Sequence, residues 1–203
     1  MNVEQIYTGC LAQGAYYITS NGEAAIVDPL REVQPYLERL ERDGVKLKYI
    51  FETHFHADFV SGHLDLSKKT GAPIVYGPTA KPSFDFILAS DGQEFKVGDV
   101  TIKVLHTPGH TMESATFLLK DEKGKDYAIF SGDTLFIGDV GRPDLAQKAA
   151  SMTTVSYTHL RAHETVLDLV CRLLLEKKHV LLLPLPFCMP VLTRVYYYCS
   201  SLF

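Results

Sequence analysis

The sequence predicts an α/β fold, and three observations lead to this prediction. Short apolar runs alternate along the chain with segments of helical periodicity, as in a layered domain of strands and helices. Turn signals such as Asn21-Gly22 and Gly98-Asp99 separate neighbouring apolar runs. Side chains of the metal-ligand type stand directly after apolar runs, where loops on an α/β scaffold gather to form sites.

The first half of the chain is expected to contain five strands and two helices. The strands are expected at Gln5 to Tyr7, Ala15 to Ile18, Ala24 to Val27, Leu47 to Phe51 and Pro73 to Tyr76. One helix is predicted from Val33 to Arg42, where apolar residues recur at helical spacing before Gly44. The other is predicted from Gly62 to Lys69, between Ser61 as a cap and Gly71 as a stop.

The second half is expected to be built mainly from hairpins. Strands are predicted at Gln93 to Val97, Val100 to Leu105, Ala115 to Leu119 and Tyr127 to Phe130. Two of these runs lead directly into polar, glycine-containing segments, so we expect functional loops there.

Bulk composition excludes several classes of partner. The 203 residues carry a net charge of -4, which gives no reason to expect a nucleic acid or an anionic membrane. No basic segment followed by an apolar one opens the chain, so no signal peptide and a cytoplasmic location are expected. The four cysteines form no CxxC pair, which argues against a thiolate zinc site or a disulfide framework.

The stretch from Thr53 to Asp58 is the strongest chemical signal. His54, His56 and Asp58 alternate along a loop that follows an apolar run. In an extended segment every second side chain points the same way, so these three are expected to converge. Imidazole together with carboxylate suits zinc or iron better than calcium or magnesium. An isolated HxH pair is more often a set of surface polar residues in a turn, whereas HxHxD after an apolar run, followed by TPGHT and SGDT, favours a metal site.

Two later residues complete a candidate metal centre. His110 follows Pro108-Gly109, whose turn can aim the next side chain back toward the strand ends. Asp133 follows Gly132, which allows close approach of the backbone. We expect only local roles for His63, as a helix cap or a solvent-facing side chain, and for His106, as a hydrogen-bonded strand end.

The motifs HxHxD, TPGHT and SGDTLF, in this order and spacing, resemble the metallo-β-lactamase superfamily. The resemblance covers residues 1 to about 154 and implies an αββα sandwich with the metal at one edge. Within the superfamily, ETHFHADFVSGH and SGDTLFIGDVGRPDL look most like the persulfide dioxygenase group. They are close to members whose metal domain is followed by rhodanese domains.

The resemblance also implies a ligand set. Hydrolases of the superfamily usually read HxHxDH, and the last histidine helps to hold a second metal ion. Phe59 occupies that position here, which favours a mononuclear centre. By resemblance to the persulfide dioxygenases, one Fe(II) is bound by His54, His110 and Asp133, the 2-His-1-carboxylate triad. His56 then lies near the metal without binding it, and Asp58 supports the ligands. With zinc instead, His56 becomes a ligand.

These ligands imply a reaction and its partners. The expected activity is oxidation of glutathione persulfide, or a related small persulfide, by dioxygen to sulfite and thiol. The alternative is a zinc-dependent thioester hydrolase of the glyoxalase II type. Arg142 and Asp144 match the family's GRxD segment. We count Arg142 with Asp58 as a candidate catalytic residue, although a loop-anchoring ion pair explains Arg142 equally well.

The end of the chain departs from this pattern. Residues 1–154 hold 15 Lys and Arg against 21 Asp and Glu, whereas residues 155–203 hold 5 against 3. The string from Val155 to Thr165 resembles translated sequencing adapter. We therefore expect a metal domain over 1–154, truncated in its C-terminal part, and a non-native tail over 155–203. A genuine divergent C-terminus is the alternative to that tail, and a truncated, non-catalytic metal-binding fragment is a hypothesis of another functional class.

Overall fold

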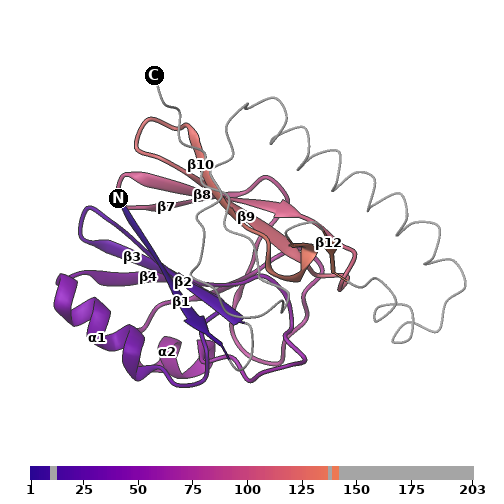
Figure 1. The fold of residues 1–203 in the computed structure, drawn as a ribbon, viewed down its shortest axis with the longest axis horizontal. Coiled ribbons are helices and arrows are strands. Elements are labelled where there is room, and N and C mark those ends of the chain that lie inside the picture. The colour runs from indigo at the N-terminus through magenta and orange to yellow at the C-terminus, as the bar shows by residue number, and fades with distance from the viewer. Residues whose placement is uncertain (10–12, 137–138, 142–203) are drawn as a thin grey trace, which may run out of the picture.

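The computed structural model describes residues 1–9, 13–136 and 139–141, which form two main β-sheets, a small two-stranded sheet of β11 and β12, and a helical layer (Figure 1). In chain order the elements are β1 (Asn2–Thr8), β2 (Gln13–Ser20), β3 (Glu23–Val27), α1 (Gln34–Asp43), β4 (Lys46–Glu52), α2 (His63–Thr70), β5 (Ile74–Tyr76), β6 (Ile87–Leu88), β7 (Glu94–Val97), β8 (Val100–His106), β9 (Ala115–Lys120), β10 (Asp126–Phe130), the 3-10 turn η1 (Gly132–Thr134), β11 (Leu135–Phe136) and β12 (Asp139–Val140).

The first sheet has the order β1-β2-β3-β4-β5-β6. It is antiparallel from β1 to β3 and parallel from β3 to β6. The β2–β3 hairpin turns at Asn21 and Gly22, which both have positive φ angles (43° and 79°). Two-residue hairpin turns favour this conformation because its twist matches that of the flanking strands. The hairpin predicted from Asn-Gly is therefore confirmed.

The second sheet is antiparallel in the order β10-β9-β8-β7 and packs on one face of the first. Helices α1 and α2 cover the other face of the first sheet (Figure 1). Successive side chains of β4 point to opposite faces of the first sheet. Phe51 belongs to the core between the sheets, and Ile50 belongs to the core beneath the helices. The described layers, helix, sheet and sheet, agree with the expected sandwich.

Local signals account for the helix ends. In α1 the buried side chains Tyr36 and Leu40 lie one turn apart, Pro35 stands in the first turn, and Gly44 ends the helix in the left-handed conformation. The very short strands β6, β11 and β12 were not predicted. A two-residue strand exists only through its pairing partner, so its own sequence carries no period. Among the described residues, no helix is both long and apolar enough to cross a bilayer.

The sheets bring four loops to one edge of the sandwich. The parallel neighbours β3 and β4 end side by side, with Val27 opposite Phe51, and lead into Asp28 and Thr53. In the second sheet, β8 and β10 both run antiparallel to β9, so they also end at a common side. The amide of Ala115 at the start of β9 donates to the carbonyl of Thr53 (2.8 Å) and joins the two sheets there.

At another contact between the sheets, Gly98 in the β7–β8 turn packs against Ser20 at the end of β2. Gly98 has a φ angle of 55°, and a Cβ atom there would lie 2.0 Å from the Ser20 carbonyl oxygen. Its amide also donates to Glu23 Oε2 (2.6 Å). Both the backbone conformation and the available space therefore require glycine.

We predict that Gly98→Ala destabilises the fold by at least about 2 kcal/mol, because a left-handed alanine and a backbone clash add. Gly124→Ala is the matched control, since Gly124 has a similar φ angle of 76° and no neighbour within 4 Å of the added Cβ. It should cost only about 1 kcal/mol. Urea unfolding of the full chain measures both, and equal losses would contradict the close-approach explanation.

Candidate metal centre

His54, His110 and Asp133 come together at the shared edge of the two sheets. The Nε2 atoms of His54 and His110 lie 3.9 and 3.6 Å from Asp133 Oδ2, and one ligand atom from each residue falls within 4.8 Å of the others. Two ligands about 2.1 Å from one tetrahedral ion lie roughly 3.4 Å apart. The spacing and the donor types therefore fit a single metal ion such as zinc or iron.

A hydrogen-bond relay through Thr53 fixes which nitrogen of His54 faces this centre. The Thr53 hydroxyl donates its one proton to Asp28 Oδ2 (2.8 Å). It lies 3.0 Å from His54 Nδ1 and must accept there, so Nδ1 carries the ring proton. His54 Nε2, on the side of Asp133, is then left with its lone pair, as a metal ligand requires.

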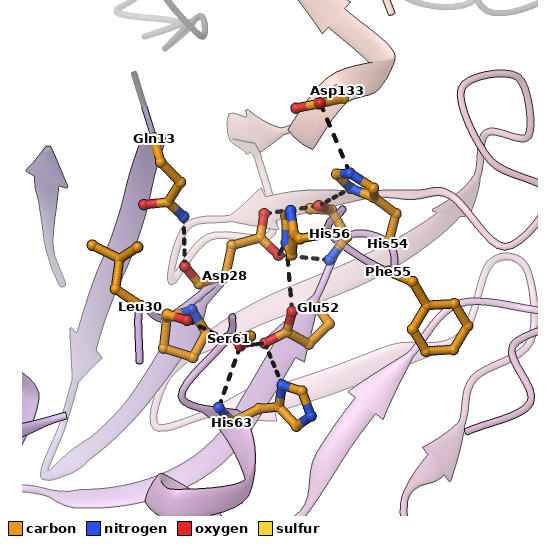
Figure 2. Close-up of polar contacts among 12 residues, drawn as sticks. Gln13, Asp28, Leu30, Glu52, His54, Phe55, His56, Ser61, His63 and Asp133 are labelled. Atoms are coloured by element: carbon orange, nitrogen blue, oxygen red, sulfur yellow. Dashed lines mark hydrogen bonds and ion pairs between the residues drawn. The ribbon is translucent and has the colours of Figure 1, made fainter. Parts of the chain in front are cut away.

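His56 turns toward a second group of polar side chains. Its Nε2 lies 3.1 Å from Asp28 Oδ1 and 3.5 Å from Glu52 Oε2 (Figure 2). These three side chains form a separate candidate ligand group. The His56 ring stays close to the centre, however, with its centroid 4.1 Å from that of His54, and it packs on Phe59 at 4.3 Å.

The three residues of the HxHxD motif do not share one environment. The chain bends at residues 57–59, and the bend carries Asp58 to the exposed surface, outside both ligand groups. The two histidine rings nevertheless lie side by side, as the alternation predicts, with centroids 4.1 Å apart.

Two buried carboxyl groups beneath the histidines have opposite electrostatic characters. Burial alone would raise the pKa of Asp28, but its close contact with His56 and the hydrogen bond from the Thr53 amide lower it to about 2. Burial raises the pKa of Glu52, against smaller lowering effects from His63 and His56. The pair therefore places a negative charge on Asp28 and favours the neutral form of Glu52.

Glu52 also connects the centre to helix α2. It is 0% exposed; its Oε1 accepts from the Ser61 hydroxyl (2.6 Å) and lies 3.3 Å from His63 Nδ1 (Figure 2). The solvent-facing role expected for His63 is therefore wrong. The local role expected for His106 agrees with the structure, where its Nε2 lies 3.1 Å from the Met112 carbonyl oxygen.

Close packing positions the remaining ligands. A Cβ atom at Gly132, whose φ is 52°, would lie 2.3 Å from Thr53 Oγ1, so only glycine lets the Asp133 turn approach His54. The hydroxyl of Thr107, just after β8, lies 3.2 Å from that of Thr134. This contact ties the loop of His110 to the turn of Asp133.

Sequence reasoning missed Asp28, Glu52 and Thr53 as site residues. The sequence did contain a signal for Asp28. This residue directly follows a predicted strand, as the HxHxD loop does, and site residues gather at such strand ends. The candidate residue Arg142 with Asp144, and the proposed tail over 155–203, lie outside the described residues.

Comparison with known proteins defines the family. The metallo-beta-lactamase superfamily profile matches residues 8–170, and the chain belongs to this superfamily. A solved metallo-beta-lactamase from Staphylococcus aureus is 34% identical, with a TM-score of 0.73 over 84% of this chain and 52% of that one. ETHE1 from Myxococcus xanthus is 29% identical, with a TM-score of 0.63 over 71% and 62% of the two chains.

The curated relatives are named hydroxyacylglutathione hydrolases, unlike the two solved structures. Hydroxyacylglutathione hydrolase from Methylococcus capsulatus is 37% identical over 145 residues, which is 70% of this chain and 54% of the relative. A probable hydroxyacylglutathione hydrolase from Schizosaccharomyces pombe is 37% identical over 123 residues, 59% of this chain and 47% of the relative. The chain thus spans about half the length of the curated relatives it matches.

The Thr53 relay leads to a prediction about metal affinity. Thr53→Val removes the acceptor for His54 Nδ1 and a donor to Asp28, so zinc affinity should fall about 10- to 100-fold. Thr53→Ser keeps the hydroxyl and should stay near the parent value. Competition with a chromophoric chelator measures both, and equal affinities for the valine and serine variants would contradict the relay.

Proposed function

We propose that this chain is the metal-binding part of an enzyme that acts at the sulfur of a glutathione conjugate. The reaction that the comparisons support best is hydrolysis of a hydroxyacyl thioester of glutathione. The curated relatives reported above, from a bacterium and a yeast, share this activity in their names at 37% identity.

The supporting observation in the structure is the placement of metal-type ligands at one edge. His54, His110 and Asp133 supply two neutral nitrogens and one carboxylate, and His56 lies directly beside them. A divalent ion held there would acidify a water molecule and polarise the thioester carbonyl. In hydrolysis, the water oxygen joins the acyl carbon, the carbon–sulfur bond breaks, and a proton from water ends on the glutathione sulfur.

The residues around the ligands hold the site in one arrangement. Thr53 and Asp28 fix the tautomer of His54. The negative charge on Asp28 attracts a cation and favours a proton on the His56 nitrogen that faces it. That arrangement leaves the other nitrogen of His56 able to act as a fourth ligand.

A specific geometric observation favours a second candidate, persulfide oxidation. His54, His110 and Asp133 group together without His56, which groups instead with Asp28 and Glu52. Phe59 takes the place of a second-metal histidine. A three-ligand set of this composition is that of mononuclear Fe(II) oxygenases, and the likeness to ETHE1 supports this candidate at the level of the structure. Persulfide, dioxygen and water would give sulfite and the free thiol.

One experiment separates the two reactions. The full chain is loaded with zinc, or with Fe(II) in the absence of air, and is given lactoylglutathione or glutathione persulfide. The hydrolase proposal expects thioester loss and thiol release with zinc and no oxygen uptake. The persulfide proposal expects oxygen uptake and sulfite with iron alone.

The outcome is decisive in each direction. Oxygen uptake without thioester hydrolysis would overturn the first proposal, and the reverse would overturn the second. A chain that binds the metal and turns over neither substrate would contradict both and favour the non-catalytic alternative.

Metal content gives a readout that does not depend on turnover. We predict one tightly bound ion per chain and less than about a tenth of that in Asp133→Ala, because the carboxylate is the ligand that both histidines face. Asp65→Ala, on the exposed surface of α2, is the matched control and should retain the ion. Elemental analysis after gel filtration measures all three, and an unchanged content in Asp133→Ala would exclude this site.

A further inference from the structure

Glu113 links the two loops that carry the histidine ligands. It follows His110 by three residues, and its Oε1 accepts a hydrogen bond from the backbone amide of Phe55 (3.1 Å). Phe55 is the residue between His54 and His56. A single side chain therefore runs from the His110 loop to the middle of the HxH segment.

The backbone of Glu113 is itself fixed on both sides. The amide of Ser114 donates to the Thr111 carbonyl (3.4 Å), and the amide of Ala115 donates to the Thr53 carbonyl (2.8 Å). The residue is only 9% exposed, so the packing around Glu113 restricts its side chain. It therefore holds its acceptor oxygen in place before a metal binds.

The position of the HxH segment depends on the Glu113 oxygen that accepts from the Phe55 amide. The Phe55 ring lies on Tyr76, with centroids 4.9 Å apart, and is drawn pointing away from the ligand histidines (Figure 2). The amide of Phe55 and this ring contact hold the residue between the two imidazoles. If the acceptor is lost, the peptide can rotate and carry both rings with it.

We propose that Glu113 is a positioning residue of the metal centre, which sets the spacing between His54 and His110 through the Phe55 amide. The proposal rests on the metal centre and on neither of the two reactions. An alternative role is a loop anchor that contributes to stability only, and another is a negative charge that attracts the cation from a distance. Three substitutions separate these roles, because reach and charge can be removed independently.

Glu113→Gln keeps the length and the acceptor oxygen but removes the charge. Glu113→Asp keeps the charge but is one methylene shorter, so it cannot reach an amide that the parent side chain reaches at 3.1 Å. Glu113→Ala removes both. The positioning role expects Gln to bind metal within about threefold of the parent, and Asp and Ala to bind about 10- to 100-fold more weakly, as for other groups that orient ligands.

The test is a titration of the full chain with cobalt(II) chloride against a competing chelator, followed by the visible absorption of the cobalt complex. The positioning role also expects altered band intensity in the Asp variant, because the ligand geometry changes. Urea unfolding of the metal-free proteins is measured in parallel. Glu94→Ala, an exposed glutamate on β7, is the control and should match the parent in affinity and spectrum.

Two results would overturn the proposal. Parent-like affinity in Asp with weak binding in Gln would show that charge, not reach, matters. Parent-like affinity and spectrum in both Asp and Ala, with reduced stability in either, would show a loop anchor only. If the alanine variant does not fold, the comparison of Asp with Gln still decides between the roles.

Discussion

The carboxylate of Asp28 is the group on which the metal centre depends. It accepts hydrogen bonds from the amide and the hydroxyl of Thr53, and it faces His56 Nε2. It therefore acts on His54 through Thr53 and on His56 directly. The residue has a positive φ angle of 49°, a conformation that costs a non-glycine residue about 1–2 kcal/mol. The parallel pairing of β3 with β4 holds it there, because that pairing places the two strand ends side by side.

The centre is assembled from both sheets, and a specific contact ties each pair of ligand loops. Thr53 packs against Gly132, Thr107 meets Thr134, and Glu113 reaches Phe55. The contacts cover a small area and carry little of the stability, which lies in the two apolar cores. These contacts set the distances between the ligand loops, and a metal ion tolerates only small errors in the placement of its ligands.

The participation of His56 is the feature that connects this geometry to function. As part of the second group with Asp28 and Glu52, it leaves a three-residue ligand set suited to an oxygenase. As a fourth ligand, it gives a centre suited to hydrolysis. Its ring lies beside that of His54, with centroids 4.1 Å apart, so it is close to the three-residue ligand set as well as to Asp28 and Glu52. The same fold therefore accommodates both reactions suggested for this chain.

The sequence by itself determined the longer strands, the two helices and the hairpin at Asn21-Gly22, because period and turn chemistry are local properties. It also predicted His54, His110 and Asp133 as ligands, and the glycine and proline neighbours of His110 and Asp133 mark those two as loop residues. Only the tertiary structure decided that Asp58 is exposed, that His56 and His63 turn toward Glu52, and that Asp28 and Glu113 contact the segment from Thr53 to His56. Those outcomes depend on contacts between residues far apart in sequence, such as the 58 positions from Phe55 to Glu113, and no local pattern encodes them.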